Sequence, residues 1–101
     1  MSATSGKGIT MKAIKLKMKR NCFWSNNLEE IDSIYITECA NPGYYKKEVL
    51  HDFVKDNPGT IQVNIWPYPS LIPAISVKRE KYVRSTSDKY RHDDLLDLPR
   101  E

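Results

Sequence analysis

The sequence predicts an α+β fold, a small and mainly antiparallel sheet of four to five strands with one packed helix, in the order β-β-α-β-β-β. Several short segments alternate apolar and polar residues, which is the period of a strand. One segment, between Asn41 and Gly59, instead carries apolar residues at helical spacing. A chain of 101 residues has room for one domain. We therefore expect a single domain at 11–101 behind a flexible leader at 1–10, which is small and polar.

Two strands are expected before the helix. In the first, Ala13, Lys15, Lys17 and Lys19 alternate with Ile14, Leu16 and Met18, which predicts one basic face and one apolar face. The second is expected within 31–39, where Ile34 to Thr37 are strong β formers. The pattern does not decide which face of this strand is buried. Ile31 and Ile34 are three residues apart, so a regular strand would place them on opposite faces.

The helix is expected to open at Asn41-Pro42-Gly43, since asparagine is a good N-cap and proline suits the first helical position. Asn57-Pro58-Gly59 should end it. The expected apolar stripe consists of Tyr45, Val49 and Phe53, widened by Leu50 and Val54, with Lys46, Lys47, Asp52 and Lys55 on the polar side. The side chain of His51 is expected to be solvated.

Three more strands are expected after the helix, around 61–65, 75–78 and 81–84. The segment from Trp66 to Pro73 is expected to be a loop, because three prolines in seven residues exclude a central strand. The apolar tail from Leu95 to Pro99 is expected to fold back onto the sheet.

The C-terminal third carries a family resemblance. Its residues run Lys81-Tyr82-Val83-Arg84-Ser85, then Asp88, then Asp93-Asp94-Leu95-Leu96-Asp97-Leu98-Pro99. They resemble the closing signature of a family of small bacterial proteins, the domain of unknown function family 3892. Ser85 and Asp94 depart from it, since threonine and asparagine are typical there. The family has no assigned activity, so the resemblance supports the fold alone.

We expect this signature to be structural. It combines apolar residues with groups suited to a turn, and the Arg84 guanidinium can bind a carboxylate bidentately, Asp94 or Asp97 being the nearest in sequence. The expected structural residues are Tyr82, Arg84, Asp94, Leu95, Leu96 and Leu98.

The sequence shows no catalytic or metal-binding motif. No two of Cys22, Cys39, His51 and His92 are closer than twelve positions, so no pair is preorganised for a metal. Ser85, Ser87, Asp88 and His92 lack a nucleophile elbow and are typical of a turn held by side-chain hydrogen bonds. We expect a non-enzymatic protein without metal or cofactor. A small enzyme or metalloprotein centred on Ser85, Asp88, His92 and the two cysteines is the third hypothesis.

Positive charge is concentrated near the start of the chain. The net charge is +3, and six lysines and arginines precede the first acidic residue, Glu29. This predicts nucleic-acid binding through Lys15, Lys17, Lys19 and Arg20, with Trp24, Tyr35, Trp66 and Tyr68 available to stack on bases. Arg79, Lys81 and Arg84 would extend the patch if the fifth strand lay beside the first. The alternative is that lysines on an exposed strand keep the sheet soluble.

The leading hypothesis is a protein-binding module. Its contact residues would be Trp66, Tyr68 and Leu71 in the proline-rich loop, with Trp24 as a second anchor, because rigid aromatic side chains bury much area at low entropic cost. The alternative is that Trp66 and Leu71 cover the open end of a small core. The sequence has neither an apolar segment of membrane-spanning length nor a secretory signal, so we expect a cytoplasmic protein that has no membrane contact.

Overall fold

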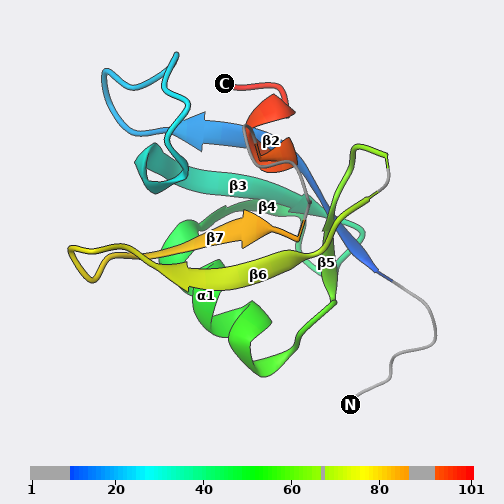
Figure 1. Ribbon diagram of the computed structural model, residues 1–101. Helices are drawn as coiled ribbons and strands as arrows, with labels where there is room; N and C mark the ends of the chain where they lie inside the picture. Colours follow the sequence, from blue (N-terminus) through cyan, green and yellow to red (C-terminus); the bar gives the residue numbers. More distant parts are fainter. Residues whose placement is uncertain (1–9, 67, 87–92) are drawn as a thin grey trace.

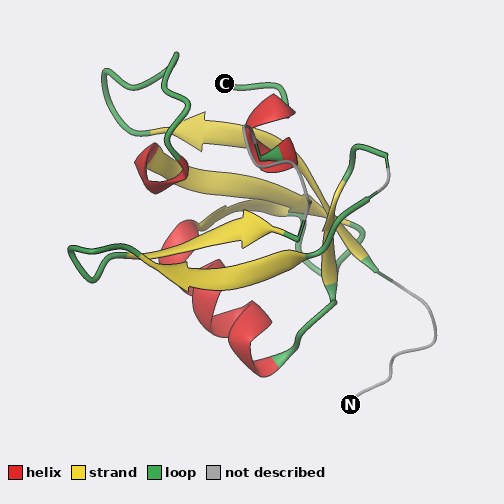
Figure 2. Ribbon diagram, in the orientation of Figure 1, coloured by secondary structure: helices red, strands yellow, loops and turns green. Residues whose placement is uncertain are grey.

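The computed structural model describes residues 10–66, 68–86 and 93–101 (Figure 1). The predicted α+β class is confirmed: one α-helix packs with a four-stranded sheet and a two-stranded sheet (Figure 2). The predicted leader, apart from Thr10, and the predicted turn residues Ser87, Asp88 and His92 lie outside the described residues. The elements are β2 (Met11–Met18), η1 (Leu28–Glu30), β3 (Ile31–Thr37), β4 (Gly43–Lys46), α1 (Lys47–Asp56), β5 (Ile61–Val63), β6 (Leu71–Ile75), β7 (Lys81–Ser85) and η2 (Asp94–Asp97).

The larger sheet has the strand order β4-β3-β2-β5. β2 and β3 are antiparallel, as are β3 and β4, whereas β5 runs parallel to β2. β6 and β7 form a separate antiparallel hairpin, and α1 packs against both strands of the hairpin as well as β3 and β4. The last strand therefore does not lie beside the first, so Arg79, Lys81 and Arg84 do not extend the basic face of β2.

Two register shifts between β2 and β3 decide which side chains face the core. Lys12 and Ala13 pair with Thr37 and Ile36, but the next pair is Lys15 with Tyr35, which leaves Ile14 as an extra residue. One extra residue reverses the alternation of faces. Consequently Ala13, Leu16 and Met18 share the buried face, and the predicted grouping of Ala13 with the lysines is wrong.

The second shift explains the ambiguous parity of the second predicted strand. Met18 pairs with Ile31 and Lys17 with Ser33, so Asp32 is the extra residue. Because the alternation reverses at Asp32, Ile31 and Ile34 are both buried.

The helix begins five residues later than its sequence signals predict. Residues Gly43–Lys46 form β4, which pairs with β3, and Lys46 is the N-cap without a side-chain capping bond. Tyr44 and Tyr45 are strong β formers beside an open strand edge, so strand pairing outweighs the local capping signal. The prediction of a helix start at Asn41-Pro42-Gly43 is therefore wrong.

The buried face of α1 also differs from the predicted stripe. Val49 is 54% exposed and Phe53 37% exposed, whereas Lys47 and His51 are buried with Leu50 and Val54. His51 Nδ1 lies 3.0 Å from the carbonyl oxygen of Tyr82 in β7, and it donates to that oxygen. The helix turns this face inward because it packs against the hairpin as well as the larger sheet. The expectation of a solvated His51 is therefore wrong.

The end of the C-terminal tail runs alongside β2, with Arg100 in a parallel bridge to Leu16 (red segment in Figure 1). Leu95, Leu96 and Leu98 are buried in the core. The N–H of Leu16 donates to the carbonyl of Pro99 at 2.8 Å, and the N–H of Glu101 donates to the carbonyl of Leu16 at 2.9 Å. The tail thus pairs with β2 at Leu16, whereas β5 pairs with the first residues of β2, Met11 to Ala13.

An aspartate fastens the tail to β7. The carboxylate of Asp93 accepts the N–H of Ser85 at 3.0 Å and the N–H of Leu95 at 2.9 Å, so it also caps η2. Tyr82 is partly buried, whereas Arg84 is exposed. The Asp93 carboxylate therefore joins tail and strand through backbone N–H groups.

A second fastening comes from Arg100, which the sequence analysis did not single out. Its guanidinium donates to three carbonyl oxygens, those of Phe23 at 2.7 Å, Ser25 at 2.8 Å and Leu96 at 3.1 Å. It therefore ties the loop after β2 to the tail.

No described helix is long and apolar enough to cross a membrane.

Candidate nucleic-acid interface

The outer face of the larger sheet carries a contiguous set of lysines and tyrosines. The reversal at Ile14 places Lys12, Lys15 and Lys17 of β2 on this side, opposite the buried residues. Tyr35 of β3 pairs with Lys15, and Tyr44 of β4 pairs with Tyr35. We call Lys12, Lys15, Lys17, Tyr35, Tyr44 and Tyr68 the lysine–tyrosine face.

Lysine ammonium groups cover the tyrosine rings at the centre of this face. Lys15 Nζ lies 5.5 Å from the ring centroid of Tyr35, and Lys17 Nζ lies 6.0 Å from that of Tyr44. The two rings meet edge to face, with centroids 5.1 Å apart. These distances are within the reach of cation–π attraction. The face therefore presents aromatic surface and positive charge together.

Lys12 extends the face toward the end of β5. Its Nζ donates to Oε1 of Gln62 at 2.8 Å and lies 4.9 Å from the ring centroid of Tyr68. Tyr68 is exposed and has a positive φ of 61°. The turn after β5 thus brings a third tyrosine beside the lysines of β2.

One carboxylate rests on the lysine–tyrosine face. The Tyr44 hydroxyl donates to Oε1 of Glu101 at 2.5 Å, and Lys15 Nζ lies 3.7 Å from Oε2. Burial and the bond to this carboxylate raise the pKa of Tyr44 to about 12. The Tyr44 hydroxyl and Lys15 in turn lower the pKa of Glu101. The face therefore stabilises an anionic oxygen at the position of Glu101.

Two of the four predicted basic residues lie elsewhere. Lys19 Nζ lies 2.7 Å from Oε2 of Glu80, which raises the pKa of Lys19 and directs its side chain toward the turn between β6 and β7. Arg20 is exposed in the turn after β2. The prediction that Lys19 shares one face with Lys15 and Lys17 is therefore wrong. Lys12 and Tyr44 were missed, because neither the bulge at Ile14 nor β4 was predicted.

The predicted protein-binding residues do not form one surface. Leu71 is fully buried in the core, so its assignment to a contact surface is wrong. Trp24 is 85% exposed and Trp66 is 78% exposed, which also excludes Trp66 as a cover of the core. Their loops lie at opposite ends of the molecule, after β2 and after β5 (Figure 1). Trp24 and Trp66 therefore lie on separate parts of the surface.

Of the residues considered for catalysis and metal binding, the described residues Cys22, Cys39, His51 and Ser85 lie in different parts of the fold. Within 10–66, 68–86 and 93–101, no three side chains of the types that bind metals converge. Cys22 and Cys39 are free thiols, and His51 is buried against Tyr82. Ser85 is buried in β7. Ser87, Asp88 and His92, which the sequence analysis grouped with Ser85, lie outside the described residues.

Comparisons of the chain with models of protein families, with curated proteins and with solved structures give no match. The resemblance to the domain of unknown function family 3892 stays a prediction.

Proposed function

We propose that this protein is a non-enzymatic binding protein whose ligand is single-stranded nucleic acid, held on the lysine–tyrosine face. The observation that carries the proposal is the placement of Lys15 and Lys17 over the rings of Tyr35 and Tyr44 on one open sheet face. Single-strand binders combine a positively charged surface with aromatic rings on which bases stack.

Each part of the face has a role in this proposal. The rings of Tyr35, Tyr44 and Tyr68 stack with unpaired bases, an interaction worth about 1–3 kcal/mol per base. The flexible lysine side chains swing from the rings to the phosphates as a base takes their place. Stacking of this kind requires bases that are not already paired, which favours single strands over duplexes.

The position of Glu101 supports the proposal further. Its carboxylate is held by the Tyr44 hydroxyl and Lys15, which are donors that a phosphate oxygen also accepts. We also propose a cytoplasmic location, since the free thiols of Cys22 and Cys39 fit a reducing compartment.

The test is fluorescence anisotropy with a labelled oligothymidylate of about twelve nucleotides, near the upper site size of one small domain, at about 50 mM salt. The test variant changes Lys12, Lys15 and Lys17 to Gln. The matched control changes the exposed residues Lys55, Lys78 and Arg79 to Gln, so both variants lose three positive charges.

The test variant should bind much more weakly, and the slope of log affinity against log salt should fall by about 0.7 per lost contact. The control should keep most of the affinity. Equal losses in both variants would mean that net charge alone drives binding. No binding by the wild type at low salt would remove the proposal.

Protein binding remains a second candidate, because two tryptophans are almost fully exposed. Tryptophan is enriched at binding hot spots. Trp24→Ala and Trp66→Ala, tested separately, should each leave the melting temperature unchanged. If a partner isolated with the wild type is lost from one variant by about 2 kcal/mol or more of binding free energy, that loop is the contact.

A further inference from the structure

At its β5 edge, the lysine–tyrosine face brings a lysine, a glutamine and a tyrosine together. Lys12 of β2 and Gln62 of β5 are paired in register, so their side chains lie on the same side of the sheet. Lys12 Nζ donates to Oε1 of Gln62 at 2.8 Å and lies 4.9 Å from the ring centroid of Tyr68. A neutral amide therefore lies within reach of a ligand that stacks on this tyrosine.

Backbone hydrogen bonds hold the Tyr68 ring in this place. The N–H of Tyr68 donates to the carbonyl of Ile65 at 2.7 Å, and the N–H of Val63 donates to the carbonyl of Pro69 at 2.8 Å. These two bonds close the turn that carries the tyrosine. The ring is 43% exposed, so it is an open stacking surface on a fixed backbone.

The lysine fixes which way the Gln62 amide faces. An ammonium group donates hydrogen bonds and accepts none, so it selects the amide oxygen and leaves the two N–H donors of Nε2 on the other branch. Within 10–66, 68–86 and 93–101, Nε2 has no hydrogen-bond partner. The ammonium of Lys12 carries three N–H groups and uses one of them in this bond. Two adjacent side chains therefore offer donors beside a stacking ring.

Adjacent donors match the edge of guanine better than the edges of the other bases. Guanine has two adjacent acceptors, O6 and N7, whereas adenine has a donor, its N6 amino group, beside N7. Thymine has the acceptor O4 next to a methyl group. Cytosine has adjacent acceptors on its pairing edge, but its single ring covers less of a tyrosine than a purine does.

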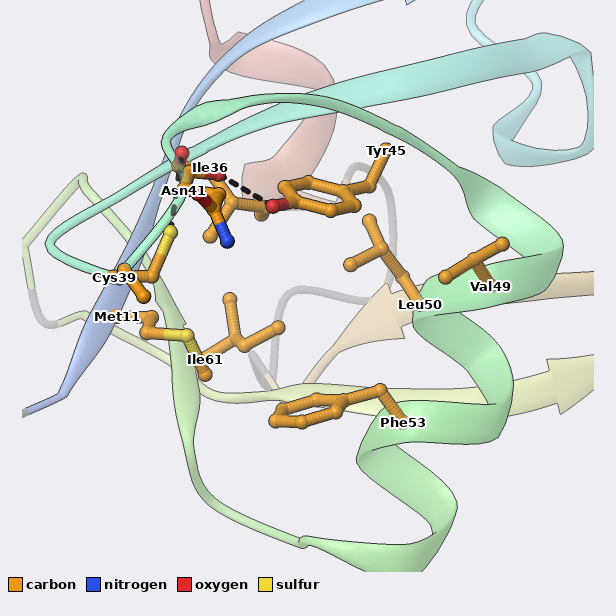
Figure 3. A pocket seen from close by; sticks show the side chains of 10 residues that line it. Met11, Ile36, Cys39, Asn41, Tyr45, Val49, Leu50, Phe53 and Ile61 are labelled. Carbon is orange, nitrogen blue, oxygen red and sulfur yellow. Dashed lines mark hydrogen bonds between the residues drawn. The ribbon is translucent and has the colours of Figure 1, made fainter.

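The apolar pocket on the opposite side of the larger sheet has a different character. Tyr45 lines this pocket of about 230 Å³, and it alternates in β4 with Tyr44 of the lysine–tyrosine face. The Tyr45 hydroxyl donates to the carbonyl of Asn41, and the Cys39 thiol lies 3.8 Å from the carbonyl of Ile36 (Figure 3). Most of the lining is aliphatic or aromatic, which disfavours the polar edge of a base. The Tyr45 ring therefore does not contribute to stacking on the lysine–tyrosine face.

We propose that Lys12, Gln62 and Tyr68 form a guanine subsite, which selects this base in the bound single strand. The base stacks on the Tyr68 ring, and its N7 and O6 accept hydrogen bonds from Lys12 Nζ and Gln62 Nε2. The bond to Gln62 keeps Nζ at the edge of the base when the base takes its place over the ring. The proposal rests on the proposed function and adds a base preference to it, because phosphate contacts carry no sequence information.

The test compares four labelled DNA strands of about twelve nucleotides. Each is an oligothymidylate with guanine, adenine, cytosine or thymine at one central position, and its binding to the full chain is measured by fluorescence anisotropy. The guanine strand should bind about fivefold or more tightly than the adenine strand, which is the lower end of discrimination by two hydrogen bonds to a base edge. A strand with 7-deazaguanine, which stacks but lacks the N7 acceptor, should lose most of this preference.

Salt gives a second readout of the same contacts. Every affinity should fall between about 50 and 200 mM salt, because the phosphate contacts release counterions. The ratio of guanine to adenine affinity should stay constant, since hydrogen bonds to a base edge release none.

Three variants test the assignment of the side chains. Gln62→Glu replaces the donor branch with an acceptor, so it should turn the preference toward adenine, whose N6 amino group donates beside N7. Asn26→Asp is the matched control, because it adds the same charge at an exposed site in the loop after β2, and it should keep the guanine preference. Tyr68→Asn removes the ring at a φ of 61°, which asparagine also adopts, and should bring the ratio close to one.

The outcomes separate this proposal from the proposed function. Absence of binding to all four strands would remove the proposed function and the guanine subsite with it. Equal binding of the four strands would overturn the guanine subsite alone. Equal binding of the guanine and cytosine strands, full affinity for 7-deazaguanine, or an unchanged guanine preference in Gln62→Glu would overturn it likewise.

Discussion

Lys47 Nζ lies 3.0 Å from Oε2 of Glu80, and this contact joins the first residue of α1 to the turn between β6 and β7. The Lys47 side chain is only 1% exposed, and its ammonium group also donates to the carbonyl of Glu29. Lys19 Nζ reaches the same oxygen of Glu80 at 2.7 Å. One partly exposed carboxylate therefore partners a buried lysine and links three regions that are distant in sequence.

Replacing Glu80 with Gln should destabilise the fold. The substitution leaves the buried ammonium of Lys47 without its carboxylate, and a buried group that loses a charged partner costs about 1–3 kcal/mol. Urea unfolding followed by circular dichroism measures the change in the free energy of unfolding.

The matched control for Lys47 is its neighbour Lys46, which is exposed and pairs with Asp32 at 3.4 Å. Lys46→Met should change the unfolding free energy by less than about 1 kcal/mol, because it breaks a surface pair. Combining Lys47→Met with Glu80→Gln should recover part of the loss, since no buried ammonium then remains. A double variant as unstable as the sum of the two single variants would contradict the coupling.

Stability should fall in acid partly through Glu80. The hydrogen bond from Lys19, followed by that from Lys47, lowers the pKa of Glu80 in the folded state. A carboxyl group with a lower pKa in the folded state stabilises the protein above its unfolded pKa, about 4.3 for glutamate, and loses this contribution as pH falls through the folded value. Melting temperatures measured from neutral pH into acid should therefore decline less steeply in Glu80→Gln than in wild type. The exposed Glu38→Gln serves as control and should retain the wild-type slope.

Replacing Glu101 with Gln should affect both Tyr44 and the proposed ligand. Burial and the Glu101 carboxylate raise the pKa of Tyr44 to about 12, so removing the negative charge should lower that pKa. Tyrosinate absorbance during alkaline titration measures the shift, and Tyr44→Phe identifies the signal. Oligothymidylate should bind about 2–5-fold more tightly, because a partly exposed charge contributes up to about 1 kcal/mol. A lower pKa of Tyr44 without tighter binding would show that Glu101 does not compete with the ligand.

Leu95→Ala should be strongly destabilising. Leu95 of η2 is fully buried in the core, and truncating a buried leucine costs about 2–5 kcal/mol. Thermal unfolding should show a large fall in melting temperature, whereas Val77→Ala, at a side chain 98% exposed, should stay within about 0.5 kcal/mol of wild type. Equal stability of Leu95→Ala and wild type would mean that the tail contributes nothing to the core.

Part of the candidate interface was accessible from the sequence. Alternation in β2 identified Lys15 and Lys17, and Tyr35 was recognised as a residue able to stack on bases. Lys12 and Tyr44 could not be found in this way. The bulge at Ile14 and the pairing of β4 with β3 depend on contacts between strands. The alternation of apolar and polar residues within one strand does not reveal these contacts.

The sequence by itself determined the α+β class and the approximate places of most strands, because side-chain alternation is set by the strand itself. Only the tertiary structure decided where the helix begins and which way it faces. Val49 and Phe53 have the spacing of a buried stripe, yet Lys47 and His51 lie on the buried side. The reason is that burial depends on the surfaces packed against a helix, and here Glu80 and the carbonyl of Tyr82 satisfy the two polar side chains from a hairpin that follows the helix in sequence.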